Sequence, residues 1–300
     1  MSCKLNKTPT SQSTEKRPCA DDSSIESTQP TNNRQPVTTH DKPSLHGKVL
    51  IAEDNDVNQK VISLMLKSCN LNFEIAEDGL KVIECLNRNH YDLILMDCQM
   101  PELDGYETTR IIRNSNKPYQ GIPIIALTAN AMASDRDKCI AAGMNGFIAK
   151  PVNQQHLNDT PKEWLNPNTD GVVNSDNNTP ENSHNVLIDQ TELLALINIM
   201  EDEFNTLLET FIQDSEIKLE TLALTVHASN TLETNDILHL LKGSCLSIGA
   251  IRLISLLTSL ETLANEASFN GIKQRLPQLE RCYRETVDEI NRIVTNHTIR

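Results

Sequence analysis

The chain has little positive charge and no long apolar run, and these two deficits exclude several classes of function. It holds 27 Lys and Arg against 41 Asp and Glu, a formal net charge of −14 at pH 7. Because a nucleic acid backbone needs a basic surface, we expect no nucleic-acid partner. No apolar stretch approaches the ~20 residues of a membrane span, and residues 1–16 contain no hydrophobic segment of a secretory signal. We therefore expect a cytoplasmic protein without membrane insertion.

Paired cysteines and nucleotide-binding loops are also missing from the sequence. The eight cysteines include no CxxC pair, so we expect reduced thiols rather than disulfides or a zinc site. Cys98 is interpreted as a packing residue, because nothing near it in the sequence would lower its thiol pKa. Neither a Walker loop nor a GxGxxG loop is present. We find no candidate ATP-binding domain, and expect no kinase activity from this chain.

Composition divides the chain into four parts. Residues 1–46 are rich in Ser, Thr, Gln, Asn and Pro and hold almost no large apolar residues, which predicts a disordered tail. Residues 166–187 are equally polar and are predicted to form a linker. Residues 47–165 alternate strand-like and helix-like segments, whereas residues 188–297 have helical periodicity throughout. We therefore expect two folded domains.

Five short runs predict strands in residues 47–165. The run Asp92–Met96 reads DLILM and ends at Asp97, as expected for a strand buried on both faces of a parallel sheet. The other four runs are Val49–Ala52, Asn72–Ala76, Ile122–Leu127 and Gly146–Ala149. Between the runs lie helical patterns, such as the one with Leu80, Ile83 and Leu86 on its apolar face. This alternation predicts right-handed crossovers and a doubly wound α/β domain.

Polar residues stand at the ends of four of these runs. They are Glu53 with Asp54, then Asp97, Thr128 and Lys150. One strand-end Asp is most often an ordinary loop cap, but four such ends meet at the same edge of a parallel sheet, where ligand sites lie. Carboxylates suit Mg²⁺, whereas a Lys ammonium and a Thr hydroxyl suit the oxygens of a phosphoryl group. The set therefore predicts phosphoryl transfer to a carboxylate with Mg²⁺ as the cofactor.

The segments VLIAEDN, MDCQMPELDG, LTANA and AKP, within residues 48–165, resemble the receiver domain of two-component response regulators. The resemblance implies a flavodoxin-like, five-stranded parallel sheet in the order 2-1-3-4-5. It also implies that Asp97 is the phospho-acceptor. The implied direct Mg²⁺ ligands are Asp54, Asp97 and the backbone carbonyl of Gln99, with Glu53 assisting through water.

The same resemblance implies roles for residues near the end of this domain. Thr128 and Lys150 would bind the phosphoryl group, and Phe147 would be a rotating aromatic residue that forms a switch with Thr128. The Lys150–Pro151 bond is expected to be cis. The sequence departs from the family at Pro161, where a Leu is usual. Because Pro inside a helix costs ~3 kcal/mol, the last helix of this domain is predicted to be short or broken.

Residues 188–297 are predicted to form an all-α, antiparallel helical bundle. Asp189 and Glu192 have the spacing of a capping box and open the first helical pattern. Longer helical patterns follow, one of them over Asn235–Gly249. The apolar face of that helix consists of Ile237, Leu241, Cys245 and Ile248. His239 lies about 180° from this face, which predicts that its imidazole points outward.

Lys242 and Gly243 share the helix face of His239, three and four residues further on. An ordinary surface His would not explain a Gly in mid-helix, which costs ~1 kcal/mol. The segment HLLKGSCLSIGA resembles the signature of histidine-containing phosphotransfer (HPt) domains, which are four-helix bundles. The resemblance covers about residues 188–297 and implies that His239 is a second phospho-acceptor, with Lys242 and Gly243 beside it.

Three interpretations fit this pair of domains. In the first, the chain is a phosphorelay protein that is loaded by a separate sensor histidine kinase and hands phosphoryl groups to a downstream response regulator. In the second, it is a non-enzymatic interaction module whose phosphorylation only switches a binding surface. In the third, it is the detached C-terminal part of a hybrid histidine kinase, an ancestry that the segment LHGKVLIAEDNDVNQKV favours.

Overall fold

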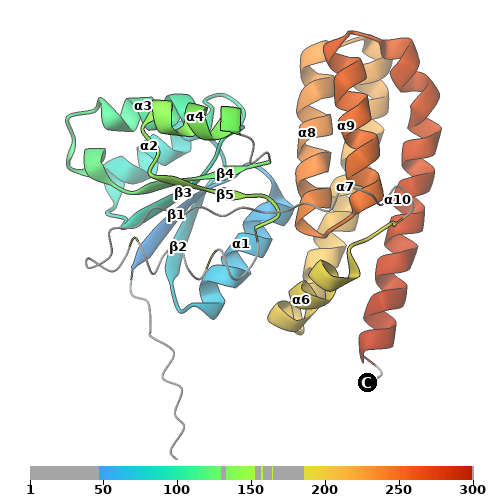
Figure 1. Ribbon diagram of the computed structural model, residues 1–300, viewed down its shortest axis with the longest axis horizontal. Helices are drawn as coiled ribbons and strands as arrows, with labels where there is room; N and C mark the ends of the chain where they lie inside the picture. The colour runs from blue at the N-terminus through green and yellow to red at the C-terminus, as the bar shows by residue number, and fades with distance from the viewer. Residues whose placement is uncertain (1–46, 130–132, 153–156, 158–163, 165–185, 299–300) are drawn as a thin grey trace, which may run out of the picture. The chain divides into compact units, whose positions relative to one another are not determined.

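The computed structural model describes residues 47–129, 133–152, 157, 164 and 186–298 (Figure 1). All of them belong to one compact unit, Pro43–Arg300. The predicted tail, most of the predicted linker and the predicted break at Pro161 lie outside the described residues. No helix among those described is both long enough and apolar enough to span a membrane.

Five parallel strands form one sheet in the order β2-β1-β3-β4-β5, as predicted. The strands are β1 Lys48–Ala52, β2 Asn72–Ala76, β3 Leu93–Asp97, β4 Ile124–Thr128 and β5 Gly146–Ala149. Each lies within two residues of the run that predicted it. Every residue of β3 and β4 is buried, which explains why these two strands have no alternating polar face.

Helices cover both faces of this sheet, so the first domain is doubly wound (Figure 1). The helices are α1 Asp56–Ser68, α2 Gly79–Arg88, α3 Gly105–Arg113 and α4 Ala133–Ala142, with a short 3₁₀ helix at Pro118–Gly121. One face packs Val57 and Val61 of α1 into a buried cluster, and the other packs Val82 and Leu86 of α2. The predicted apolar face of α2 was wrong at Leu80, which is 58% exposed, because Val82 takes its place against the sheet.

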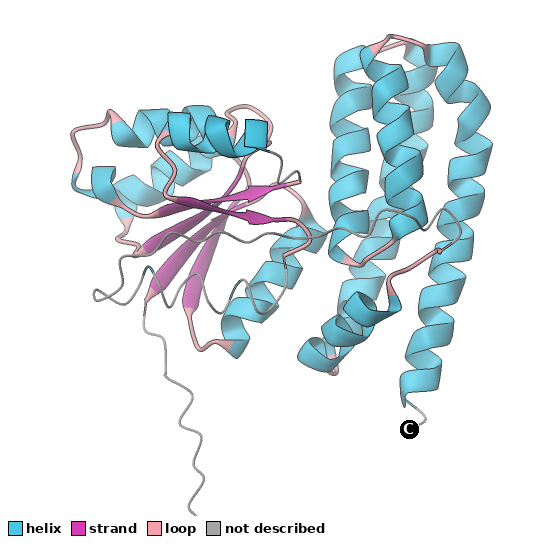
Figure 2. Ribbon diagram, in the orientation of Figure 1, coloured by secondary structure: helices cyan, strands magenta, loops and turns pink. Residues whose placement is uncertain are grey.

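The second domain is entirely helical (Figure 2). Its helices are α6 Gln190–Met200, α7 Glu203–Ala228, α8 Thr231–Ser247, α9 Ile251–Asn265 and α10 Phe269–Thr298. Helices α7 to α10 contact one another in a ring, α7 with α8, α8 with α9, α9 with α10 and α10 with α7. Short connections between successive members make neighbouring helices antiparallel. The predicted four-helix bundle is therefore present, with α6 as an additional helix against α7.

Side-chain caps mark where two helices of the second domain, α6 and α8, begin. Asp189 accepts hydrogen bonds from the backbone N–H groups of Thr191 and Glu192, at 2.9 and 3.2 Å, as its position in the sequence predicted. Helix α8 starts four residues earlier than predicted, because Asn230 accepts a hydrogen bond from the Glu233 N–H and caps it.

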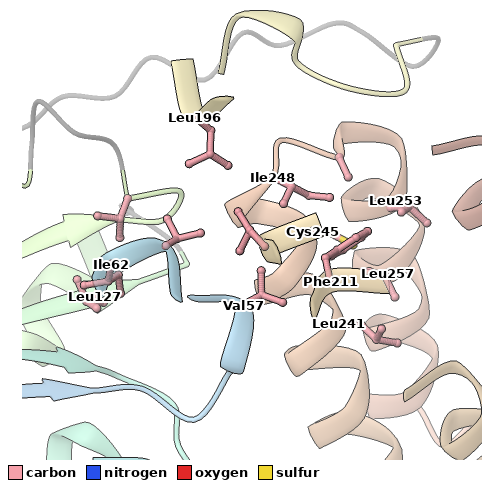
Figure 3. Close-up of a cluster of buried hydrophobic side chains, with 14 of the residues drawn as sticks. Val57, Ile62, Leu127, Leu196, Phe211, Leu241, Cys245, Ile248, Leu253 and Leu257 are labelled. Atoms are coloured by element: carbon pink, nitrogen blue, oxygen red, sulfur yellow. The ribbon is translucent and has the colours of Figure 1, made fainter. Parts of the chain in front are cut away.

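Helix α1 also contacts α6, α7 and α8 of the bundle. One continuous cluster of buried apolar side chains includes Val57 and Ile62 of α1 together with Phe211 and Leu241 of the bundle (Figure 3). The only tryptophan, Trp164, packs against the same cluster. The two domains thus share a hydrophobic core along α1, which nothing in the sequence indicated.

Candidate functional site

The parallel sheet brings the predicted polar residues to one edge. Glu53 and Asp54 directly follow β1, Asp97 and Thr128 are the last residues of β3 and β4, and Lys150 directly follows β5. The register pairs Ala52 with Met96, Asp97 with Leu127, and Thr128 with Ala149, so these ends are level with one another. Glu53, Asp97 and Thr128 are buried. Convergence of the four strand ends is therefore confirmed.

Lys150 ties two of the carboxylates together. Its ammonium donates to Glu53 Oε2 at 2.7 Å and to Asp97 Oδ2 at 2.5 Å, and its side chain is only 6% exposed. The Lys150–Pro151 bond is cis, as expected. Asn58 donates to the second oxygen of Glu53 at 2.8 Å. These partners hold Glu53 and Asp97 in fixed positions.

The acidic cluster carries more negative charge than Lys150 can balance. Oxygens of Glu53, Asp54 and Asp97 lie within 4.8 Å of one another. Burial, and then the nearby Asp97 charge, raise the pKa of Glu53, and the same two causes raise the pKa of Asp54 to about 6. A set of close oxygen ligands with surplus negative charge fits a hard divalent cation. Gln99 follows on the loop, where its backbone N–H donates to Asp97 Oδ1 at 3.2 Å.

Gly105, the last residue of the segment MDCQMPELDG, fixes the loop after β3. A Cβ on Gly105 would lie 2.0 Å from the backbone oxygen of Asp97. The Gly105 N–H donates to the Cys98 carbonyl at 3.2 Å, and Asp104 caps α3 by accepting from the Glu107 N–H at 2.7 Å. Only glycine therefore lets α3 begin against the strand end that carries Asp97.

The predicted switch residues lie on β4 and β5. Thr128 is buried, and its carbonyl accepts from the Lys150 N–H at 2.7 Å. Phe147 is half-buried, with the guanidinium of Arg136 5.8 Å from its ring centroid. Thr128 therefore lies at the end of β4 beside the acidic cluster, and Phe147 lies on β5 three residues before Lys150.

Cys98 has the character of a packing residue. Its sulfur lies 3.9 Å from that of Cys139, and both side chains are buried. The contact with Cys139, followed by burial, raises the pKa of the Cys98 thiol. All six cysteines in the described part of the chain are free.

The second predicted centre, His239, lies on α8. The helix buries Ile237, Leu238, Leu241 and Cys245, whereas His239 on the other side is half-buried. Lys242, on the His239 face, forms an ion pair with Glu261 of α9. The imidazole points outward from its helix, as predicted, and is partly covered.

The first domain supplies that cover. One small cavity is lined by Asp54, Asp97, Lys150, His239 and Gly243. Burial lowers the pKa of His239, and the charge of Asp97 opposes this shift in part. The structure therefore brings together the two centres that the sequence predicted separately.

Comparison with known families divides the chain in the same way. The response regulator receiver domain matches residues 49–161, and the Hpt domain matches residues 206–293. Neither of these two domains is a kinase domain.

Known proteins resemble part of the chain. It is similar to hybrid signal transduction histidine kinase B of Dictyostelium discoideum, with 42% identity over 120 residues, 37% of this chain and 6% of that protein. "Probable histidine kinase 1" of Oryza sativa subsp. indica is 34% identical over 175 residues, 45% of this chain and 18% of that protein. The chain thus spans less than a fifth of the length of these curated relatives.

Among solved structures, the receiver domain of a sensor histidine kinase from Pseudomonas aeruginosa PAO1 is 43% identical. It covers 40% of this chain and 98% of its own, with a TM-score of 0.38. That structure has a magnesium ion coordinated in its active-site cleft.

Proposed function

We propose that this chain, a phosphorelay protein in which a response regulator receiver domain precedes an Hpt domain, accepts a phosphoryl group on Asp97 and passes one through His239. The observation that carries the proposal is the cavity that both residues line, with Lys150 bonded to Asp97 inside it. We assign residues 47–165 to the receiver and 188–297 to the HPt domain, joined by 166–187 and preceded by the tail 1–46.

The donor in this proposal is a separate sensor histidine kinase in the cytoplasm, and the recipient is a downstream response regulator. An Asp97 oxygen attacks the phosphorus of the donor phosphohistidine, so that an O–P bond forms as the N–P bond breaks. Lys150 and the Thr128 hydroxyl bind phosphoryl oxygens. Such transfer depends on positioning and charge, which the fixed Lys150 contacts provide.

Mg²⁺ fits the acidic cluster of this receiver. The direct ligands we propose are Asp54, Asp97 and the Gln99 carbonyl, with Glu53 assisting through water. The close carboxylate oxygens and the raised pKa of Asp54 support this choice, because a divalent cation would offset the surplus negative charge. When bound, Mg²⁺ supplies positive charge for the incoming phosphoryl oxygens.

His239 acts as a nitrogen nucleophile in this proposal. Burial lowers its pKa, which keeps one ring nitrogen unprotonated at neutral pH. Lys242 adds positive charge on the same helix face, and Gly243 leaves room for a second protein surface. Phosphorylation of Asp97 would be read out through Thr128 and Phe147, which we propose as the switch pair.

The relatives favour a related origin for the chain. Those named above are a hybrid signal transduction histidine kinase and a probable histidine kinase. A second candidate is therefore that the chain works as the C-terminal part of such a kinase. In both cases Asp97 and His239 have the same chemistry, and only the source of the phosphoryl group differs.

Labelling with a small phosphodonor tests the assignment of Asp97. The full chain and its Asp97→Ala variant would be incubated with acetyl phosphate, with Mg²⁺ or with EDTA, and weighed intact by mass spectrometry. We expect one or two added phosphoryl groups in the wild type with Mg²⁺, because His239 can take one from Asp97, and none in the variant or in EDTA. His239→Gln is the control and should still be labelled. Equal labelling of wild type and Asp97→Ala would refute the assignment.

A further inference from the structure

The face of the bundle that carries His239 is matched to α1 of the receiver by specific hydrogen bonds. Asn55 Nδ2 donates to the Leu240 carbonyl at 2.9 Å and to Ser244 Oγ at 2.8 Å. Ser247 Oγ donates to Asn58 Oδ1 at 2.5 Å. Both asparagines are buried by this contact region. Their amides therefore have hydrogen-bond partners on α8. A facing surface of other chemistry would leave these buried polar groups unpaired.

A second set of contacts lies further along α1. The Lys60 ammonium donates to the Thr206 carbonyl at 3.3 Å and to Thr210 Oγ1 at 3.2 Å, both on α7. Apolar packing lies between the asparagine contacts and the Lys60 contacts. Val57 and Val61 of α1 share a buried cluster with Leu207 and Phe211 of α7. Helix α1 is thus held to both α7 and α8, which fixes its orientation on the bundle.

Gly243 lies where the two surfaces approach each other closely. A Cβ at this position would lie 3.2 Å from Asn58 Nδ2 and 3.8 Å from Asn55 Nδ2. Those atoms belong to the same two asparagines that bond to the serines of α8. The mid-helix glycine therefore serves the contact with this receiver's own α1.

We propose that the HPt bundle of this chain is the built-in partner of its own receiver. Asn55, Asn58 and Lys60 act as positioning residues that hold His239 over Asp97, so that transfer runs within one chain. The docked bundle also keeps other proteins away from the end of the sheet that carries Asp97. This inference rests on the proposed function, because it concerns how the two phospho-acceptors meet.

The transfer step is balanced by the groups present. A lone pair on a His239 ring nitrogen forms the N–P bond as the O–P bond of the phosphoaspartate breaks. The Asp97 carboxylate leaves with the bonding electron pair, and the ring proton stays on the other nitrogen. No further reactant is needed.

Small molecules can still reach the docked site. A cleft beside it is lined by Asp54, Gln99, Met100, Asn235, His239 and Lys242. An ion or a small phosphodonor fits this opening, whereas a second protein would have to displace the bundle. The docked chain should therefore be loaded readily by acetyl phosphate and slowly by a phosphorylated protein.

The test compares Lys60→Glu with Lys67→Glu in the full chain. Both changes reverse one charge on α1, but Lys67 is exposed at the end of the helix, whereas Lys60 bonds to α7. After loading with acetyl phosphate and Mg²⁺, phosphohistidine would be followed across protein concentrations. We expect a rate constant independent of concentration in wild type and Lys67→Glu. In Lys60→Glu it should fall about tenfold, the factor for a loss of ~1.4 kcal/mol, and rise with concentration.

Two measurements keep this test separate from the proposed function. Labelling of Asp97 itself should be unchanged in Lys60→Glu, and a chain without any Asp97 labelling would refute the proposed function rather than the docking. Hydrogen exchange of α1 amides, measured without phosphodonor, should be faster in Lys60→Glu than in Lys67→Glu.

The docking is overturned if Asp97 is labelled but phosphohistidine forms in proportion to protein concentration in the wild type. Identical exchange and transfer in the two Lys variants would overturn it too. Mixing the Asp97→Ala and His239→Gln chains gives a further check. Efficient transfer between them at low concentration would show that the partner is a second copy of the chain.

Discussion

The two proposed phospho-acceptor centres are built in opposite ways. The Asp97 centre draws on the ends of four strands, and its charges are fixed by contacts inside the receiver, such as those from Lys150. His239 stands on one helix, and part of its surroundings comes from the receiver. The first centre is therefore complete within its own domain, whereas the second is completed by a partner surface.

Gly105 and Gly243 show the same difference between a site within one domain and a site between two domains. A Cβ on Gly105 would meet the backbone of β3 at 2.0 Å, whereas a Cβ on Gly243 would meet only side-chain nitrogens of the other domain, at 3.2 Å or more. Backbone in a packed sheet cannot move away, but the end of a side chain can. Gly105 is thus needed for the receiver to fold, whereas Gly243 is needed for the contact between the domains.

The largest expected effect is that of Gly105→Ala. The added methyl group forces either α3 or the end of β3 to shift, and overpacking of this kind costs about 3 kcal/mol. Thermal unfolding followed by Trp164 fluorescence should show a transition lowered by roughly 6–12 °C. Gly121→Ala is the matched control, since a Cβ there meets nothing within 4 Å. Equal transitions for the two variants would break the contrast between the glycines.

A smaller effect concerns pH and Mg²⁺. The pKa of Asp54 is raised to about 6 in the folded chain, so the stability linked to it is present at low pH and lost as the pH rises through 6. In EDTA, we expect the free energy of unfolding to fall by about 1 kcal/mol between pH 5 and pH 7.5, a value discounted for solvent screening. Mg²⁺ should reverse the trend, because it binds the ionised cluster.

Asp54→Asn provides the control for this pH dependence. Without the Asp54 carboxylate, the unfolding transition in EDTA should change less between pH 5 and pH 7.5 than in the wild type, and the change that remains comes from Glu53, whose pKa is also raised. Denaturant titrations at several pH values measure the difference. A wild type whose stability in EDTA rises steadily over this range would contradict the assigned surplus of negative charge.

The smallest effect is expected for Gly243→Ala, and it should differ in sign between two measurements. Alanine is the better helix former, so the free energy of unfolding should rise by up to about 1 kcal/mol. The new Cβ would press on Asn58 Nδ2, so transfer from Asp97 to His239 should slow a few-fold. Calorimetry and phosphohistidine kinetics check the two halves. A loss of stability would show that Gly243 is needed by α8 itself.

The architecture of both domains followed from the sequence because burial leaves a strong pattern. Strands β3 and β4 are buried at every residue, so they appeared as continuous apolar runs that stop at Asp97 and Thr128. The convergence of Glu53, Asp54 and Lys150 with these ends then followed from the parallel order of the strands. The orientation of His239 followed from the buried stripe of α8.

What the sequence could not predict depends on contacts between distant residues. Asn55 and Asn58 looked like ordinary residues at a helix start, because their partners Ser244 and Ser247 lie in the other domain. The role of Gly105 was hidden because a close backbone approach leaves no periodic pattern. Leu80 was placed on the wrong face of α2, since an exposed Leu and a buried Val stand only two residues apart.

Phosphorus NMR of the loaded chain tests the central claim most directly. Wild type, Asp97→Ala and His239→Gln would be treated with acetyl phosphate and Mg²⁺ at equal concentration. We predict a phosphoimidazole resonance in the wild type, an acyl phosphate resonance in His239→Gln, and neither in Asp97→Ala. A phosphoimidazole resonance in Asp97→Ala as strong as that of the wild type would contradict transfer from Asp97 to His239.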